Sequence, residues 1–355
     1  MVMEITELME GARNCVTGFC GVKSGEEALI LTSPSRKNDP LVIDALAVAC
    51  RDVGANVTTL VFNPLPHEMW HVPPIIAAAM CQANVIFGVG TMAPLHGRAG
   101  GKAMYECEAM LCNVAADTPE LMASDWARFP MEVTWAIARR VFEVTRNSKT
   151  LHVTDEAGTD MAAGIHPTHI TGFPVNIEPG PGLRTNHGVW PGATCGLHPE
   201  GDVHGVIVAS YDHEHNLAET MKVLVEKHRA VKIEGGGIDG IRWRNNHKRF
   251  KDANWSCEIM WGMHPKVPMW KSPGVMAPMA SRRSGTLHFG FGNGRALGGN
   301  IVTNYHDDLV LLKPTLYLDD FKMIENGKLT ILNEPGIRDV ASKYGNPDII
   351  LAEVD

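Results

Sequence analysis

Residues 27–62, EALILTSPSRKNDPLVIDALAVACRDVGANVTTLVF, decide the fold of the first half of the chain. The apolar run at 27–32 predicts a strand, and the turn-rich SPSRKNDP follows it. Residues 40–54 place apolar side chains at helical spacing and stop at a glycine, whereas 56–62 is β-branched and strand-like. Strands that alternate with helices in this way indicate a parallel sheet flanked by helices.

The same alternation continues toward residue 148. Residues 73–83 predict a helix that begins with proline in its first turn, and 84–89 predict another buried strand. Helices are also expected over 102–115 and 130–145. We therefore predict that residues 1–148 form an α/β domain with a parallel sheet, which faces the substrate.

The pattern changes near Leu151, and we predict a second, α+β domain over 149–355 that is rich in strands and binds the metal. Short apolar runs are separated there by glycine and proline clusters. One helix is expected from Leu217 to His228, because Met221, Val223, Leu224 and Val225 suit a helical face. Residues 230–243, AVKIEGGGIDGIRW, predict a strand, a glycine turn and another strand.

Composition excludes several classes of protein. The net charge of −8 argues against a surface for nucleic acid or anionic membranes, which requires a basic patch. The one basic cluster, within residues 242–251, is interpreted as a solvated surface or loop. The sequence lacks a run of about 20 apolar residues and a secretion signal at its beginning. Eight cysteines without a CxxC pair predict reduced, mostly buried thiols. We expect a soluble, cytoplasmic protein that acts on a small molecule.

The segment from Gly285 to Asp320 carries the chemistry. His306 and Asp308 lie two residues apart in an apolar run, and side chains at i and i+2 of a strand point to the same face. His288 lies in an earlier apolar run, and a hairpin would bring it beside His306. Two histidines and a carboxylate suit a divalent transition metal.

This segment resembles the C-terminal motif of the thermophilic-type metallo-aminopeptidases, the aminopeptidase T-like family. An upstream motif of that family, which contains a metal-binding glutamate, is similar to residues 257–265, where Glu258 takes the glutamate's place. The resemblance thus implies Glu258, His288, His306 and Asp308 as metal ligands, and a homodimer or larger homo-oligomer. The matching residues are Gly285–His288, Gly298–Gly299, His306–Asp308, Pro314–Thr315 and Asp319–Asp320.

Two departures from that family suggest one metal ion and a substrate other than a peptide N-terminus. The segment from Trp190 to Thr194 lacks the glutamate that the family shows there, and Arg295 stands where a tyrosine is expected. The chain also resembles the iron(II)-dependent 2,5-dihydroxypyridine 5,6-dioxygenase family, which likewise lacks the glutamate. That family has a histidine in place of Glu258, no equivalent of His288, and a loop histidine similar to His96.

The first hypothesis is an aminopeptidase-like, metal-dependent hydrolase. It would cleave an amide-type C–N bond of a small molecule, and cyclic or heteroaromatic amides are included among the expected substrates. One divalent ion, Zn, Mn or Fe(II), would activate water. A general base must reach that water, and Asp307, His187 and Glu258 are the candidates. The expected substrate contacts are His96, His187, Trp190 and Trp261, with core packing as the alternative role of the tryptophans.

Two other classes remain open. An iron(II)-dependent ring-cleaving dioxygenase would use Glu258, His306 and Asp308, although two carboxylates and one histidine depart from the usual two-histidine, one-carboxylate triad. A protein that keeps the fold without catalysis would contain no bound metal. The glycine-rich stretches 235–237 and 290–294 do not lie between a strand and a helix of a βαβ unit, so we predict turns rather than a dinucleotide site.

Overall fold

The computed structural model divides the chain into two units, Met1–Trp135 with Phe173–Gly192, and Ala136–Gly172 with Ala193–Asp355. The prediction of two domains that meet near residue 148 differs from this division, since a later segment returns to the first unit. The structure describes residues 3–33, 40–63, 72–90, 98–173, 187–212, 216–272, 275–276, 280–294, 299–301 and 303–354.

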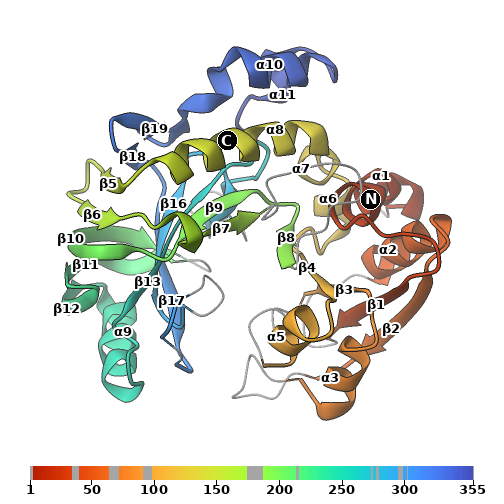
Figure 1. Ribbon diagram of the computed structural model, residues 1–355, viewed down its shortest axis with the longest axis horizontal. Coiled ribbons are helices and arrows are strands. Elements are labelled where there is room, and N and C mark those ends of the chain that lie inside the picture. Colours follow the sequence, from red (N-terminus) through yellow and green to blue (C-terminus); the bar gives the residue numbers. More distant parts are fainter. Residues whose placement is uncertain are drawn as a thin grey trace. The chain divides into compact units, whose positions relative to one another are not determined.

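The first unit contains a five-stranded parallel sheet with the order β2-β1-β3-β4-β8 (Figure 1). The predicted α/β architecture with a parallel sheet is confirmed. The strands are β1 (Glu27–Thr32), β2 (Asn56–Val61), β3 (Val85–Val89), β4 (Met110–Val114) and β8 (His187–Trp190). The helices are α1 (Ile5–Arg13), α2 (Pro40–Asp52), α3 (Pro74–Met80), α5 (Arg98–Tyr105), α6 (Pro119–Met122), α7 (Asp125–Arg128), and a π-helix over Asn14–Phe19.

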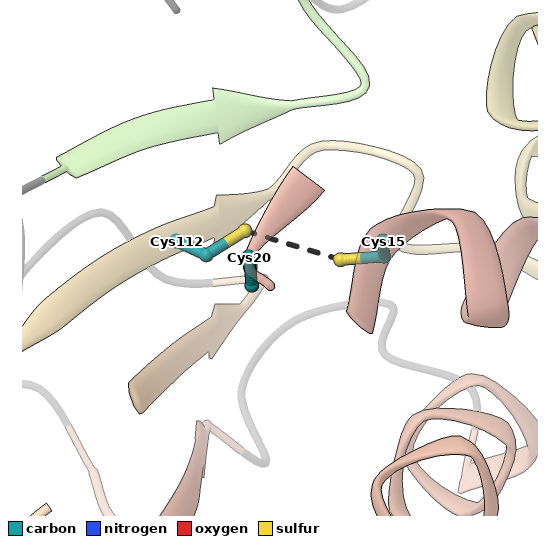
Figure 2. Close-up of side chains that lie close together, drawn as sticks. All are labelled: Cys15, Cys20 and Cys112. Carbon is teal, nitrogen blue, oxygen red and sulfur yellow. Dashed lines mark hydrogen bonds between the residues drawn. The ribbon is translucent and has the colours of Figure 1, made fainter. Parts of the chain in front are cut away.

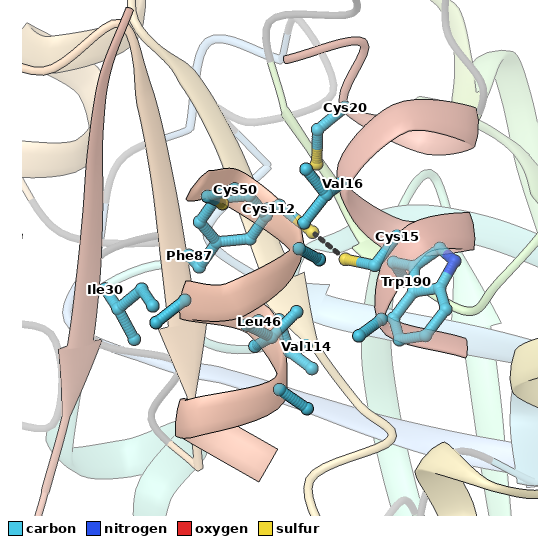
Figure 3. Packing of buried hydrophobic residues seen from close by; sticks show 14 of the residues in the cluster. Cys15, Val16, Cys20, Ile30, Leu46, Cys50, Phe87, Cys112, Val114 and Trp190 are labelled. Carbon is cyan, nitrogen blue, oxygen red and sulfur yellow. Dashed lines mark hydrogen bonds between the residues drawn. The ribbon is translucent and has the colours of Figure 1, made fainter. Parts of the chain in front are cut away.

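Both faces of this sheet are buried under helices. Successive residues of β1 alternate between two hydrophobic clusters, with Ile30 in one and Leu29 and Leu31 in the other. Helices α1 and α2 pack on the first cluster, and α3 and α5 on the second. Figure 3 shows part of the first cluster, including Trp190 at the end of β8. Burial on both faces explains why β1 and β3 are nearly continuous apolar runs.

The predicted helix over 102–115 is wrong in its second half. Helix α5 ends at Tyr105, and Met110–Val114 forms β4, which pairs with β3 and β8. Every residue of β4 is buried. A short apolar run without alternation has no periodicity that separates a buried strand from a buried helix, so the pairing partners decide its structure.

The second unit contains a thirteen-stranded sheet among the described residues, whose printed pairs are antiparallel. The main path runs β20-β19-β18-β5-β6-β10-β17-β16-β13-β9-β7, with β11 and β12 beside β10. This confirms a strand-rich C-terminal domain. The strands are β5 (Thr150–Thr154), β6 (Asp160–Gly164), β7 (Ile170–Phe173), β9 (Thr194–Leu197), β10 (Glu200–Tyr211), β11 (Asn216–Glu226), β12 (Arg229–Gly235), β13 (Ser256–Gly262), β16 (Leu287–Gly292), β17 (His306–Leu311), β18 (Thr315–Leu318), β19 (Phe321–Glu325) and β20 (Lys328–Leu329).

A small two-stranded sheet and several helices complete the described structure. Helix α8 begins in the first unit and ends in the second. The small sheet consists of β14 (Trp270–Ser272) and β15 (Val275–Met276). The helices are α8 (Met131–Asn147), α9 (Gly237–Arg249), α10 (Pro335–Ser342), α11 (Pro347–Ile350), and 3-10 turns at Pro167–His169, Ala280–Arg282 and Thr330–Asn333.

Two predictions in the middle of this unit are wrong. The expected helix from Leu217 to His228 is strand β11, in which Met221, Val223 and Val225 are buried at period two and pair with β10. The expected second strand after the glycines is helix α9, and the basic cluster lies largely on it. Gly236 precedes that helix with a φ of 76°, so the glycine run ends a strand and begins a helix. Apolar residues at 221, 223, 224 and 225 are compatible with both a helical and a strand period, and pairing with β10 makes this segment a strand.

The cysteines agree with their prediction. All eight are free thiols, and Cys15, Cys20 and Cys112 converge inside the first unit (Figure 2). The Sγ atoms of Cys15 and Cys112 lie 4.0 Å apart among apolar side chains, where burial raises the pKa of Cys15. These thiols therefore pack as small hydrophobic groups.

None of the helices in the described ranges combines the length and the apolar character that crossing a bilayer demands.

A buried histidine predicts acid sensitivity. His264 is 3% exposed, and burial, with a smaller effect of Lys266, lowers its pKa from 6.5 to about 3. The unfolded chain therefore binds this proton first, and stability falls as pH drops from 6.5 toward 3. At pH 5 the loss from His264 is about 2 kcal/mol.

The His264→Asn variant keeps an acceptor for the Lys266 amide, which donates to His264 Nδ1 over 3.1 Å. We expect the difference in unfolding free energy between pH 8 and pH 5, measured with urea, to shrink in this variant. An unchanged difference would show that His264 does not carry the effect. His152→Asn is the matched control, because the His152 side chain is 49% exposed.

Candidate metal centre

Three neighbouring strands of the second unit bring the predicted ligands together. In the register of β13, β16 and β17, Glu258 pairs with Gly290, and Gly290 pairs with Asp308. His306 pairs with Gly292 and lies two residues before Asp308. Directly paired residues and residues two apart share a face of a sheet, so Glu258, His306 and Asp308 point to the same side.

The donor atoms of these three residues lie within 4.8 Å of one another. His306 Nε2 is 3.3 Å from Asp308 Oδ1 and 3.5 Å from a carboxylate oxygen of Glu258. Both carboxylates are 8% exposed. Two buried carboxylates that share one imidazole nitrogen form a negatively charged group, and a divalent cation compensates such a group.

Gly290 has no side chain, and this leaves space between the three donor residues. A Cβ atom at this position would lie 2.7 Å from Asp308 Oδ1, 2.8 Å from Glu258 Cβ and 3.2 Å from His306 Cε1. The central strand thus contributes no side chain where the flanking strands converge. This cradle and the oxygen and nitrogen donors fit one divalent transition metal. The prediction of a turn at Gly290 is wrong, because this glycine lies inside β16.

His306 is held in one orientation. Its Nδ1 lies 3.0 Å from the carbonyl oxygen of Asn293, so Nδ1–H donates to that oxygen and Nε2 remains available as a metal donor. Burial lowers the pKa of His306, but Asp308 and Cys257 raise it well above its ordinary value.

His288 lies beside this set and contacts Glu258. Its Nε2 is 3.0 Å from Glu258 Oε1, and the residue is 1% exposed. Burial raises the pKa of Glu258, but the hydrogen bond and the charge interaction with His288, together with His306, bring it below its ordinary value. The three-donor group leaves His288 out. This geometry favours a role for His288 in orienting the Glu258 carboxylate, whereas the sequence predicted direct ligation.

The His288→Phe variant distinguishes the two roles. If His288 orients Glu258, we expect affinity for a divalent metal ion to fall about 10- to 100-fold, the usual cost of losing a partner outside the ligands. The measurement is competition with a chromophoric chelator under anaerobic conditions, and His288→Gln should recover part of the affinity. A loss as complete as that of His306→Ala would show direct ligation instead. An affinity equal to that of the unaltered protein would contradict both roles.

Arg282 is a residue that the sequence patterns did not indicate. It lies in the 3-10 turn before β16, and its guanidinium donates to Met260 Sδ over 2.8 Å. Burial lowers the pKa of Arg282, whereas Glu258 and Asp308 raise it. Arg282 is therefore close enough to both carboxylates to interact with them electrostatically. It belongs to no spaced motif, and only the fold places it there.

Asp307 lies on the opposite face of β17 from Asp308, as strand alternation requires. Its carboxylate is 3.6 Å from Arg242 of helix α9 and 3.5 Å from the Tyr305 hydroxyl. Burial raises its pKa to about 6, and Arg242 opposes the shift. These contacts favour a structural role for Asp307 over its predicted role as general base.

The structure describes the four predicted substrate contacts only in part. His96 lies outside the described residues, and of His187 the structure describes the backbone, which begins β8 of the first unit. Trp190 and Trp261 are fully buried in different units. Their burial is what core packing requires, so the roles of all four in substrate binding stay predictions.

Glu258, His306 and Asp308, placed by neighbouring strands around the space at Gly290, define a candidate metal-binding site. The model of the family described as NicX, 2,5-dihydroxypyridine 5,6-dioxygenase, matches residues 11–331. The chain belongs to this family. Enzymes of this family use iron(II), and the residues fit the single divalent transition metal that was predicted.

Individual relatives agree with this assignment. A 2,5-dihydroxypyridine 5,6-dioxygenase of Pseudomonas putida is 26% identical over 246 residues. That match covers 63% of this chain and 66% of the relative, just under two thirds of its length. The solved structure of 2,5-dihydroxypyridine dioxygenase from Pseudomonas putida KT2440 has a TM-score of 0.72 at 18% identity, over 95% of this chain and all of that one.

Wild-type AmpT from Thermus thermophilus shares the fold more distantly. Its TM-score is 0.58 at 15% identity, over 91% of this chain and 99% of that chain. Together the matches confirm the predicted superfamily, which includes the dioxygenase-like enzymes. They contradict the hydrolase hypothesis, with its amide substrate and metal-activated water, and support the alternative, a ring-cleaving dioxygenase. The hydrolase hypothesis rests on Glu258 and His288, which match the aminopeptidase motif.

Proposed function

We propose that this protein is an iron(II)-dependent dioxygenase that opens the ring of a dihydroxylated pyridine or a closely similar heteroaromatic ring. The family match over residues 11–331 is the observation that carries the proposal. The converging donors Glu258, His306 and Asp308 support it. Both atoms of one O₂ enter the product while one ring bond breaks, so no external reductant is needed.

Glu258, His306 and Asp308 would hold the ion in this proposal. When bound, iron(II) supplies the redox chemistry that O₂ requires for reaction with a closed-shell ring. His288 holds the Glu258 carboxylate, and the Asn293 carbonyl fixes the imidazole of His306. The donor set differs from the two-histidine, one-carboxylate triad in having a second carboxylate.

The charges favour an anionic substrate oxygen. Two carboxylates and a divalent ion sum to zero, and the Arg282 guanidinium, which interacts with Glu258 and Asp308, adds one positive charge. A deprotonated ring hydroxyl would balance that charge in a region of low dielectric constant. A small molecule is therefore the partner that the site suits. A cytoplasmic location, a homodimer or larger homo-oligomer, and the absence of nucleic-acid and membrane partners remain parts of the proposal.

The test is oxygen uptake by protein that has been made metal-free and then reconstituted anaerobically with iron(II), zinc or manganese. With 2,5-dihydroxypyridine, we expect the iron protein alone to consume one O₂ for each ring lost. Heterocyclic amides should not be hydrolysed by any of the three forms. Ring loss without oxygen consumption, or activity with zinc, would contradict the proposal.

A further inference from the structure

A second group of possible metal donors, which shares no residue with the first, lies in the second unit. It consists of His169, at the end of the 3-10 turn Pro167–His169, His198, which directly follows β9, and Glu200, which begins β10. One donor atom from each residue lies within 4.8 Å of the others. The His198 amide donates to the His169 carbonyl over 3.1 Å, which holds the two segments together.

His198 is the informative member of this group. It is 7% exposed, and neither ring nitrogen has a hydrogen-bond partner among the described residues. Its Nδ1 is 4.0 Å from Glu200 Oε1, too far for a hydrogen bond, whereas His169 Nδ1 lies 2.5 Å from the same oxygen. Burying an imidazole without a partner costs free energy, so a missing partner is expected beside Nδ1.

We propose that His169, His198 and Glu200 bind a zinc-class divalent ion, separate from the catalytic iron. Two imidazoles and a carboxylate, with a water molecule in the fourth position, are a common zinc donor set. Such an ion, bound after a small approach of the two side chains, would give Nδ1 of His198 the partner that Glu200, 4.0 Å away, does not provide by a hydrogen bond. Metal binding requires a neutral imidazole, and burial lowers the pKa of His198.

The contacts of His198 indicate that this ion would stabilise a neighbouring segment of the chain. The His198 ring packs against the chain near the catalytic centre, because a Cβ at Gly294 or Gly299 would lie 3.2 Å or 2.3 Å from its Cδ2. Gly294 follows Asn293, whose carbonyl oxygen accepts from His306. An ion on His198 would therefore fix the end of β9 against the segment that orients a catalytic ligand.

The experiment measures zinc binding alone. The starting protein is full-length His306→Ala/Asp308→Asn, which removes the catalytic site, and the metal-free form is titrated with zinc against a chromophoric chelator. We expect one equivalent to bind. Adding His198→Gln or Glu200→Gln should weaken that binding by at least about 100-fold, since losing a ligand costs more than losing an outer partner. Cobalt(II) in place of zinc should give a visible absorption band that both variants abolish.

His204→Gln is the matched control. His204 also pairs with a carboxylate, Asp202, at 3.3 Å, but it is exposed and has no third donor in the described groups. Zinc affinity should stay unchanged in this variant. The Glu200 side chain is 39% exposed, so Glu200→Gln should fold normally, which a thermal melt checks.

The absence of zinc binding in the starting protein would overturn this proposal, as would equal affinity in the starting protein, His198→Gln and Glu200→Gln. Since no activity is measured, the result does not depend on whether the proposed dioxygenase function is correct.

Discussion

Asp308→Asn is expected to lower kcat/KM for ring cleavage by more than about 100-fold, because it removes a charged metal ligand rather than an outer partner. Asparagine keeps the size of the side chain, so the fold should remain. Glu258→Gln and His306→Ala are expected to behave in the same way, since all three donors lie within 4.8 Å of one another. The measurements are iron content after anaerobic reconstitution, oxygen uptake and a thermal melt.

Asp320→Asn is the control for Asp308→Asn, because it makes the same change at an exposed carboxylate of the second unit. It should keep both iron and activity. An Asp308→Asn protein with full iron content and full activity would remove Asp308 from the site. Loss of activity together with the fold would leave the ligand role to be decided by Glu258→Gln and His306→Ala, which change different strands.

Gly290→Ala is expected to abolish iron binding although it alters no ligand. The added methyl group would lie 2.7 Å from Asp308 Oδ1 and 2.8 Å from Glu258 Cβ, both closer than ordinary contacts allow. The two flanking strands must then separate, or Asp308 must turn away. Overpacking of this kind typically costs about 1–3 kcal/mol of stability. We expect a larger loss of iron affinity than of folding stability, because the strain falls on two of the donor residues, Asp308 and Glu258.

Gly336→Ala in α10 is the matched control, since a Cβ at this position meets no atom within 4 Å. The Gly336→Ala variant should keep iron, activity and stability. Iron content and urea unfolding are measured for both variants. Full iron content in Gly290→Ala would show that the ion does not lie between Glu258 and Asp308.

The first unit could be predicted well from the sequence, because its strands and helices follow each other locally. Residues 27–62 carry a complete strand, helix and strand, and all three elements are observed. Errors arose where pairing with distant strands decides the structure. Residues 110–114 and 217–226 are strands because β3, β8, β10 and β12 lie beside them, and no local period reveals that.

The candidate site was predictable in part. The spacing of His306 and Asp308 follows from strand geometry, and the antiparallel hairpin with His288 is observed. The register places His288 opposite Val310 rather than His306, which spacing alone does not determine. Gly290 and Arg282 acquire their positions only in the folded sheet. The reaction class was not predictable, because hydrolases and oxygenases can use the same ligand types.

The most direct test of the central claim is to run the reaction of the iron(II) protein with 2,5-dihydroxypyridine under oxygen-18 gas in ordinary water. Mass spectrometry of the ring-opened product shows the source of its new oxygen atoms. We predict that both atoms of O₂ are found in the product. A product whose new oxygen comes from water would contradict the dioxygenase function and return the site to hydrolytic chemistry.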